Sequence, residues 1–236
     1  GGREIPRGAF TGRELENRTV GVRGIGNVGA RGAELCRGLF NMRGLAFDPR
    51  LTTEQVKARA GEKVDLDALL RESDFVSVHC PLTRDSRKMM NAQAFSVMKP
   101  EAYSITTARG FIHDEEALAE ALTSKKIAGA GLDVWEEEPP PSTHPLMKFD
   151  NVLVSPHTAG ATVESRENMS RCAAEQGLEL LDGQRPPRPT NPGCEARKRS
   201  TPQTAPPWPT YLRQPGLAPA STASRARTVG GSTLSR

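Results

Sequence analysis

The sequence lacks a long apolar run. No stretch approaches the roughly 20 consecutive apolar residues that a helix needs to cross a bilayer. The first four residues, Gly-Gly-Arg-Glu, do not resemble the apolar centre of a secretory signal peptide either. These absences predict a soluble protein without a membrane association, and we expect it in the cytoplasm.

Cysteine is scarce and unclustered. Cys36, Cys80, Cys172 and Cys194 are the four cysteines among 236 residues, and none forms a C-x-x-C pair or another metal-ligand spacing. Reduced thiols in a cytoplasmic protein are therefore expected, and the sequence predicts no metal site.

Acidic residues are nearly absent from the C-terminal part of the chain. Residues 184–236 contain nine Lys and Arg residues against one acid, Glu195, and they hold ten of the 19 prolines. This segment has no helical or strand periodicity, so we expect a disordered, basic, Pro-rich tail. Its charge could attract nucleic acid or an anionic membrane. However, no aromatic residues are interleaved with the run at 197–199, so a solvated tail is favoured and no nucleic-acid partner is expected.

Short apolar strands alternate with helical patterns between this tail and an N-terminal arm of residues 1–18. The predicted strands cover residues 19–23, 45–48, 75–78, 102–106, 127–133 and 151–154. The predicted helices run from the end of the first strand to about residue 40, over 53–60, 66–71 and 92–98, after Asp114, and over 162–182. This alternation predicts an α/β domain over residues 19–183, with a doubly wound, Rossmann-like parallel sheet and a ligand crevice at the carboxyl ends of the strands.

Several side chains have a predicted place within these elements. In the first helix, the residues expected to face the sheet are Val28, Leu35, Cys36 and Leu39. Asp65, Asn91 and Asp114 stand where helix N-caps are expected. His113 and His144 are predicted to be exposed loop or capping residues.

The first predicted strand ends in glycines with the spacing G-x-G-x-x-G, at Gly24, Gly26 and Gly29. A strand, a glycine-rich turn and a helix N-terminus direct backbone N–H groups at one point, which suits a pyrophosphate. Asp48 follows about 20 residues later, where a carboxylate can accept both ribose hydroxyls. The motif predicts an NAD site, against the alternative of a purely structural turn. Asp48 favours NAD over NADP, although the nearby Arg50 tempers that preference.

Three further strands are followed by side chains that together could transfer a hydride. Arg109, Glu138 and His157 follow the strands at 102–106, 127–133 and 151–154. Reducing a 2-oxo acid requires a cation for the carboxylate, a proton donor for the carbonyl oxygen and a carboxylate that keeps this donor protonated. Each residue alone could be an ordinary surface side chain, but their combination at successive strand ends favours a catalytic site.

A series of short motifs occurs in a fixed order. They are Gly24-Ile25-Gly26-Asn27-Val28-Gly29, Phe47-Asp48-Pro49, His79-Cys80-Pro81-Leu82-Thr83, Thr107-Ala108-Arg109-Gly110, Gly131-Leu132-Asp133-Val134 through Glu138-Pro139, and Ser155-Pro156-His157. In these motifs, from about residue 12 to 192, the sequence resembles the cofactor-binding domain of the D-isomer-specific 2-hydroxyacid dehydrogenases.

The resemblance implies an NAD-dependent oxidoreductase that interconverts a D-2-hydroxy acid and its 2-oxo acid, and it implies a homodimer. It assigns the substrate carboxylate to Arg109, acid/base catalysis to His157, and the orientation and charging of that histidine to Glu138. Asp133 is expected to bond the nicotinamide carboxamide. The other cofactor contacts that the resemblance implies, besides the three glycines and Asp48, are Asn27, Val28, Pro81 and Thr107. His79 is expected to be structural.

The chain also departs from the family pattern. The family has a substrate lobe, whereas only 18 residues precede the first strand here, so we expect impaired turnover. Arg23 occupies a strand position where the family has an apolar residue, and an unpaired buried guanidinium is costly. Phe111 replaces a usual glycine.

The alternative function is an NAD-binding dimerisation or corepressor-like module without turnover.

Overall fold

The computed structural model describes residues 12–185, and it divides into two compact units. The first unit extends to Arg166 and holds the whole sheet; the second begins at Glu167. The predicted arm and tail fall partly on residues 1–11 and 186–236, which lie outside the described residues, so those domain boundaries stay predictions.

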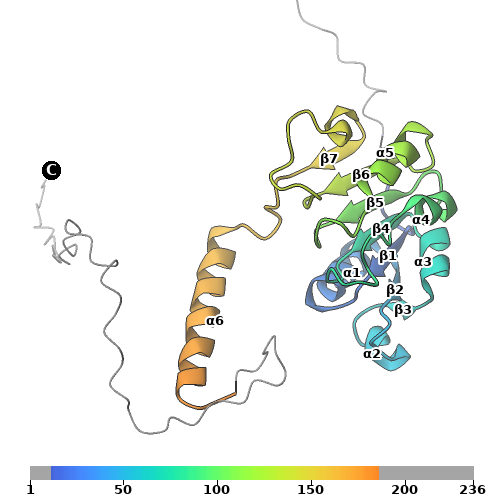
Figure 1. Ribbon diagram of the computed structural model, residues 1–236. Helices are drawn as coiled ribbons and strands as arrows, with labels where there is room; N and C mark the ends of the chain where they lie inside the picture. Colours follow the sequence, from blue (N-terminus) through green and yellow to red (C-terminus); the bar gives the residue numbers. More distant parts are fainter. Residues whose placement is uncertain (1–11, 186–236) are drawn as a thin grey trace, which may run out of the picture. The chain divides into compact units, whose positions relative to one another are not determined.

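A seven-stranded parallel sheet forms the centre of the first unit (Figure 1). Its strands are β1 (Thr19–Arg23), β2 (Arg43–Phe47), β3 (Glu62–Lys63), β4 (Phe75–Val78), β5 (Tyr103–Thr106), β6 (Gly129–Leu132) and β7 (Val152–Val154). The strand order is β3-β2-β1-β4-β5-β6-β7. Successive strands are added on one side of β1 up to β3, and from β4 onward they are added on its other side. This arrangement confirms the predicted doubly wound fold. β1 and β4 are paired, and the connections that follow them leave toward opposite sides, which creates a crevice at their carboxyl ends.

Helices flank the sheet. They are α1 (Asn27–Phe40), α2 (Thr53–Lys57), α3 (Leu66–Glu72), α4 (Ala92–Val97), α5 (Glu115–Thr123) and a short 3₁₀ helix, η2 (Pro145–Lys148). One apolar cluster joins β1 to α1, and a larger one joins β4, β5 and β6 to α3, α4 and α5. Both faces of the central strands are therefore buried, as parallel sheets require. The strand β3 and the helix η2 were not predicted.

The predicted helix caps are present. Asp65, Asn91 and Asp114 each accept a hydrogen bond from the backbone N–H three residues later, at 2.8, 3.1 and 3.3 Å. Asn41 ends α1 in the left-handed region, with φ 50°. The helix starts could be predicted from the sequence because each cap depends on only four neighbouring residues.

The prediction of which face of α1 packs on the sheet was wrong for three of its four residues, because only Cys36 packs against the apolar cluster. Val28 and Leu39 are exposed at 64% and 70%, whereas the buried residues are Gly29 and Ala33. A Cβ on Gly29 would collide with the carbonyl oxygen of Gly24, so the helix packs closely through its smallest side chains. The larger apolar residues of α1 consequently point away from the sheet.

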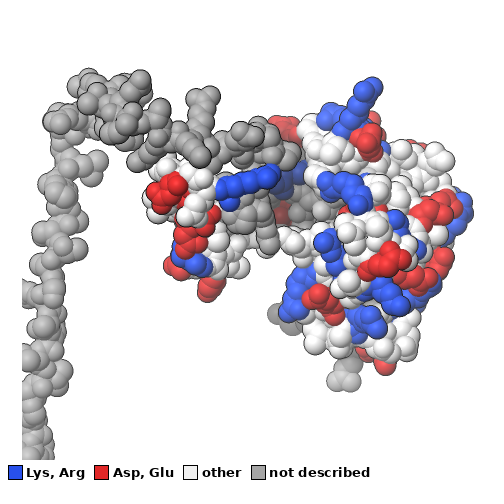
Figure 2. All heavy atoms as spheres, turned by 90° about the horizontal axis from the view of Figure 1, so that it is seen from below, with Lys and Arg blue, Asp and Glu red and all other residues white. Residues whose placement is uncertain are grey.

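The helix α6 (Val163–Leu181) continues from the first unit into the second and agrees with the helix predicted over residues 162–182. Among residues 12–185, no helix is both long and apolar enough to cross a membrane. On the face of the sheet unit that Figure 2 presents, basic and acidic side chains are interleaved, so no extended patch of one sign covers that face.

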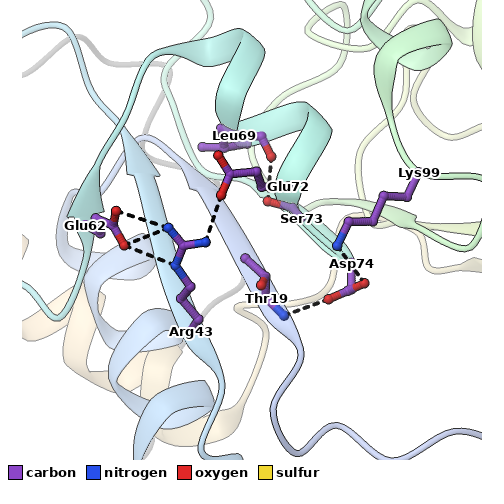
Figure 3. Close-up of polar contacts among 8 residues, drawn as sticks. All are labelled: Thr19, Arg43, Glu62, Leu69, Glu72, Ser73, Asp74 and Lys99. Atoms are coloured by element: carbon purple, nitrogen blue, oxygen red, sulfur yellow. Dashed lines mark hydrogen bonds and ion pairs between the residues drawn. The ribbon is translucent and has the colours of Figure 1, made fainter.

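Ion pairs and hydrogen bonds connect the amino-terminal ends of the strands next to α3 (Figure 3). Arg43 of β2 forms a two-pronged contact with Glu62 of β3, at 3.1 and 3.0 Å, and bonds Glu72 of α3 at 2.7 Å. Asp74 accepts bonds from the backbone N–H of Thr19 and from Lys99, at 2.8 and 3.0 Å. Burial alone would raise the pKa of Asp74, but these donors outweigh it and the pKa is lowered.

His113 corrects another expectation. It is not an exposed loop residue, because only 4% of its surface is accessible. Its Nε2 lies 2.9 Å from the Ser104 hydroxyl, its ring packs near Phe95, and its Nδ1 has no hydrogen-bond partner among the described residues. Burial lowers the pKa of His113 from its ordinary 6.5 to about 4, because the imidazolium would lose its hydration.

This burial makes the stability of the fold depend on pH. The folded state binds a proton on His113 less readily than the unfolded chain does. The neutral ring therefore contributes its full stabilisation to the free energy of unfolding above pH 6.5, and this stabilisation is lost as the pH falls toward 4. We expect the His113→Leu variant to lose less free energy of unfolding between pH 7 and pH 4 than the wild type, by about 3 kcal/mol. Urea unfolding followed by circular dichroism measures this difference, and identical pH slopes in the two proteins would contradict it.

Candidate functional site

The glycine turn between β1 and α1 uses its three glycines differently. Gly24 has φ 89°, and a Cβ there would lie 2.8 Å from the backbone nitrogen of Cys80. Gly29 allows α1 to pack against the turn, as described above. Gly26 is the N-cap of α1, and a Cβ placed on it would meet no atom within 4 Å. Gly24 and Gly29 are therefore needed by the fold, while Gly26 borders open space.

The N-terminus of α1 faces that space without a counter-charge. Gly26 provides no side-chain cap, and the first turn contains no acidic residue. The first N–H groups of a helix have no intrahelical partner and carry a partial positive charge, which favours a bound anion. This end of α1 therefore fits the diphosphate of a dinucleotide. Contacts of Asn27 and Val28 with a cofactor stay predictions.

Asp48 follows β2 beside the glycine turn. This residue is 5% exposed, and its Oδ1 accepts a hydrogen bond from the backbone N–H of Arg50 at 3.0 Å. The Arg50 guanidinium lies 3.9 Å from the same oxygen. Among the described residues, no hydrogen bond to Oδ2 is found, and a contact between this oxygen and a ribose hydroxyl stays a prediction.

Arg23 is buried at the end of β1, with 8% of its surface exposed. Its guanidinium carbon lies 4.8 Å from the centre of the Phe47 ring, which gives a cation–π contact. Its Nε has no hydrogen-bond partner among the described residues. The expected cost of this charge is therefore offset only in part, by the face of the Phe47 ring.

An open cleft of about 590 Å³ lies next to the glycine turn. Its lining residues are Val28, His79, Cys80, Pro81, Leu82, Thr107, Ala108 and Arg109. These residues come from α1 and from the loops after β4 and β5, so the cleft occupies the crevice predicted from the strand order. Its size is in the range of small-molecule sites, and it includes four of the predicted site residues.

Glu138 and His157 are in contact although 19 residues separate them. The Oε2 of Glu138 lies 2.8 Å from Nδ1 of His157, and its Oε1 accepts a bond from the backbone N–H of Trp135 at 3.1 Å. The hydrogen bond with His157 is the main cause that lowers the pKa of Glu138; burial opposes it, and Trp135 and the charge of Arg109 add to it. The carboxylate form is thus favoured, and Nε2 of His157 has no hydrogen-bond partner among the described residues.

Arg109 lies on the loop after β5, where it lines the cleft and acts electrostatically on Glu138. Its Nη1 donates to the carbonyl oxygen of Ala108 at 2.6 Å. The next residues turn sharply, and Phe111 has φ 62°, a region that a glycine would occupy without strain. The guanidinium of Arg87 lies over the Phe111 ring, with its central carbon 4.4 Å from the ring centre.

Asp133 holds the turn that carries His157. Its Oδ1 accepts bonds from the Ser155 hydroxyl and the Thr158 N–H, both at 2.7 Å, and its Oδ2 accepts from the Ala159 N–H at 3.0 Å. Burial alone would raise the pKa of Asp133, but these donors outweigh it and lower the pKa. A contact with the nicotinamide carboxamide stays a prediction, because most of this carboxylate is already bonded.

His79 makes hydrogen bonds within the cleft wall. Its Nε2 lies 2.8 Å from the Ser77 hydroxyl, and its Nδ1 lies 3.4 Å from that of Thr107. Burial lowers the pKa of His79, so the neutral ring is favoured. These contacts agree with the structural role expected for it. Thr107 and Pro81 line the cleft, as the cofactor prediction requires, while any contact with a cofactor stays a prediction.

Sequence reasoning missed the contacts that hold the site together. Trp135 donates its indole N–H to the carbonyl oxygen of Ser155 at 3.0 Å, and Asp133 bonds residues 22 to 26 positions away. No spacing in the sequence reports such contacts, because they depend on how two loops after neighbouring strands meet.

Comparisons with known proteins agree with this geometry. Residues 2–159 match the model of the "D-isomer specific 2-hydroxyacid dehydrogenase, NAD binding domain" family. A glyoxylate reductase of Thermofilum pendens is 44% identical over 180 residues, covering 75% of this chain and 52% of that protein. A D-3-phosphoglycerate dehydrogenase of Archaeoglobus fulgidus is 40% identical over 177 residues, or 75% of this chain and 33% of that protein.

Solved structures show the same likeness. The NAD-complexed D-isomer specific 2-hydroxyacid dehydrogenase of Lactobacillus delbrueckii ssp. bulgaricus superimposes with a TM-score of 0.71 at 31% identity, covering 80% of this chain and 60% of that one. A D-lactate dehydrogenase of Aquifex aeolicus, complexed with NAD and lactic acid, gives 0.66 at 32% identity, with 74% and 56% covered.

The chain spans about half the length of the glyoxylate reductases it matches. The matched half includes the glycine turn, Asp48 and the cleft. With the family model covering residues 2–159, this chain belongs to the D-isomer specific 2-hydroxyacid dehydrogenases and carries their NAD-binding domain.

Proposed function

We propose that the chain binds NAD(H) and provides the reactive groups for interconverting a D-2-hydroxy acid and its 2-oxo acid. The observation that carries the proposal is the Glu138–His157 pair, with its 2.8 Å contact and with a carboxylate that is influenced by the charge of Arg109 in the wall of the cleft. A histidine oriented by a carboxylate is the arrangement that proton transfer to a carbonyl oxygen needs.

Each residue has a defined task in this proposal. The guanidinium of Arg109 binds the substrate carboxylate. His157 donates a proton from Nε2 to the carbonyl oxygen and removes it in the reverse direction, while Glu138 holds Nδ1 and balances the charge of the imidazolium. Bound NADH supplies the hydride. The free N–H groups at the start of α1 and the Oδ2 of Asp48 hold the diphosphate and the ribose.

The proposed substrate is a small 2-oxo acid such as glyoxylate. Glyoxylate reductases and D-3-phosphoglycerate dehydrogenases are among the relatives, and a lactic acid complex is among the similar structures. Turnover by this chain alone is proposed to be weak. The side chains of His157 and Glu138 are 43% and 38% exposed, and hydride transfer benefits from a site that excludes water.

The second candidate function is an NAD-binding dimerisation module without turnover. The exposed apolar residues of α1 favour a homodimer, since Leu35 and Phe40 are 40% and 43% exposed and Leu39 is more exposed still. Such a dimer fits an active enzyme equally well. A cytoplasmic location is also proposed; its support is that Cys36, Cys80 and Cys172 are free thiols.

Substitution of Asp48 tests the cofactor site. We expect Asp48→Asn to weaken NADH binding about 10- to 100-fold, because a charged hydrogen-bond acceptor for the ribose is lost. NADPH should lose less affinity, since the repulsion of its 2′-phosphate is removed as well. Fluorescence titration with each nucleotide measures both effects. Asp67→Asn on the exposed side of α3 is the matched control, and a wild-type chain that binds no NADH would overturn the proposal.

Substitution of His157 tests the chemistry. Asparagine tolerates the positive φ of this position, 57°, so we expect His157→Asn to fold and to bind NADH normally. Oxidation of NADH with glyoxylate, hydroxypyruvate or pyruvate should fall at least about 100-fold, the usual contribution of an acid/base group. Equal rates in both proteins would refute the assignment of His157. If the wild type binds NADH and dimerises without any turnover, the second candidate function is the correct one.

A further inference from the structure

Trp135 lies where three loops of the proposed site meet. These loops follow β5, β6 and β7, and they carry Arg109, Glu138 and His157. We propose that Trp135 is a positioning residue that keeps the three loops in their relative places. This inference rests on the proposed function, since it concerns the geometry of the same site.

Trp135 and Glu138 belong to the same loop, and the contact between them is made by the backbone of Trp135. The N–H of Trp135 donates to Oε1 of Glu138 at 3.1 Å. The other oxygen, Oε2, faces Nδ1 of His157 at 2.8 Å. The carboxylate is therefore held from both sides, and its orientation toward the histidine depends on where the backbone of Trp135 lies.

The contact with the His157 loop is made by the side chain. The indole Nε1 donates to the carbonyl oxygen of Ser155 at 3.0 Å, while Asp133 holds the opposite side of the same turn. His157 adopts φ 57° inside this turn. A residue with a side chain keeps such a conformation only where surrounding contacts enforce it, and the bond from Trp135 is one of them.

The contact with the Arg109 loop is made by close packing. A Cβ on Gly110 would collide with the carbonyl oxygen of Trp135. The backbone next to Arg109 therefore lies directly against that of Trp135. A shift of Trp135 would displace the Arg109 loop as well as the other two.

Trp135 itself is firmly held. Its side chain is 2% exposed, and His144 packs edge-on against the indole with 5.2 Å between ring centres. His144 lies 3.1 Å from Oε2 of Glu115, whose Oε1 accepts the N–H of Glu136 at 2.8 Å. The indole is thus held in place through His144 and Glu115 of α5. Its single polar atom, Nε1, bonds the loop that carries His157.

The decisive variant is Trp135→Phe, which keeps an aromatic ring and the backbone contacts but removes the indole donor. Carboxyl ¹³C NMR titration of Glu138 reports the result without turnover. In the wild type we expect the pKa of Glu138 below its ordinary value, because His157 and the backbone N–H of Trp135 stabilise the carboxylate. In Trp135→Phe the His157 turn loosens, and the pKa should rise toward the ordinary value.

Kinetics provide the second readout. We expect kcat with glyoxylate to fall about 10- to 100-fold, the effect of misplacing reacting groups by about 1 Å. The Kd of NADH should stay within about twofold, because the glycine turn and Asp48 are untouched. Replacing Trp135 with 3-benzothienylalanine, which keeps the shape of tryptophan and lacks the N–H, should reproduce both changes if the phenylalanine variant does not fold. Tyr103→Phe, at the opposite end of β5, is the matched control.

The outcomes separate this inference from the proposed function. A Glu138 titration unchanged in Trp135→Phe and in the benzothienyl variant would overturn the positioning role, whatever the activity. A shifted titration in a chain that shows no turnover would support the role of Trp135 and count against the dehydrogenase activity.

Discussion

The parallel register of the sheet is the constraint on which the candidate site depends. Arg23 of β1 is paired with Val78 of β4, Val78 with Thr106 of β5, Thr106 with Leu132 of β6, and Leu132 with Val154 of β7. Five strands therefore end at one level, and their five following loops start side by side. Residues far apart in the sequence reach each other through this alignment, and a one-residue slip of any strand would move its loop out of reach.

The loops add a second level of order to this alignment. Asp133 and Trp135 follow β6, and the side chains of both form hydrogen bonds with the turn after β7. That turn is short and carries His157, the proposed proton donor, which has a positive φ. The Glu138–His157 pair is therefore held by the loop that also supplies its carboxylate. Rigid support of this kind allows a partly exposed pair to keep one geometry.

Much of the fold could be predicted from the sequence, because its signals are local. The caps at Asp65, Asn91 and Asp114 and the glycine turn each depend on a few neighbouring residues. The sheet-facing side of α1 could not be predicted, since large apolar residues are the usual sign of burial and here Gly29 and Ala33 face the sheet. The burial of His113 and the contacts of Trp135 were missed for a related reason: both depend on which loops and helices become neighbours in space.

The three glycines of the turn are under two unrelated constraints. Any side chain at Gly24 or Gly29 would strike the backbone of Cys80 or of Gly24 itself, whereas one at Gly26 would enter open space. A side chain at either of the first two would destabilise the fold, whether or not a nucleotide is ever bound. A descendant of this chain that had abandoned its cofactor would therefore retain Gly24 and Gly29, and Gly26 would be the position where drift first became visible.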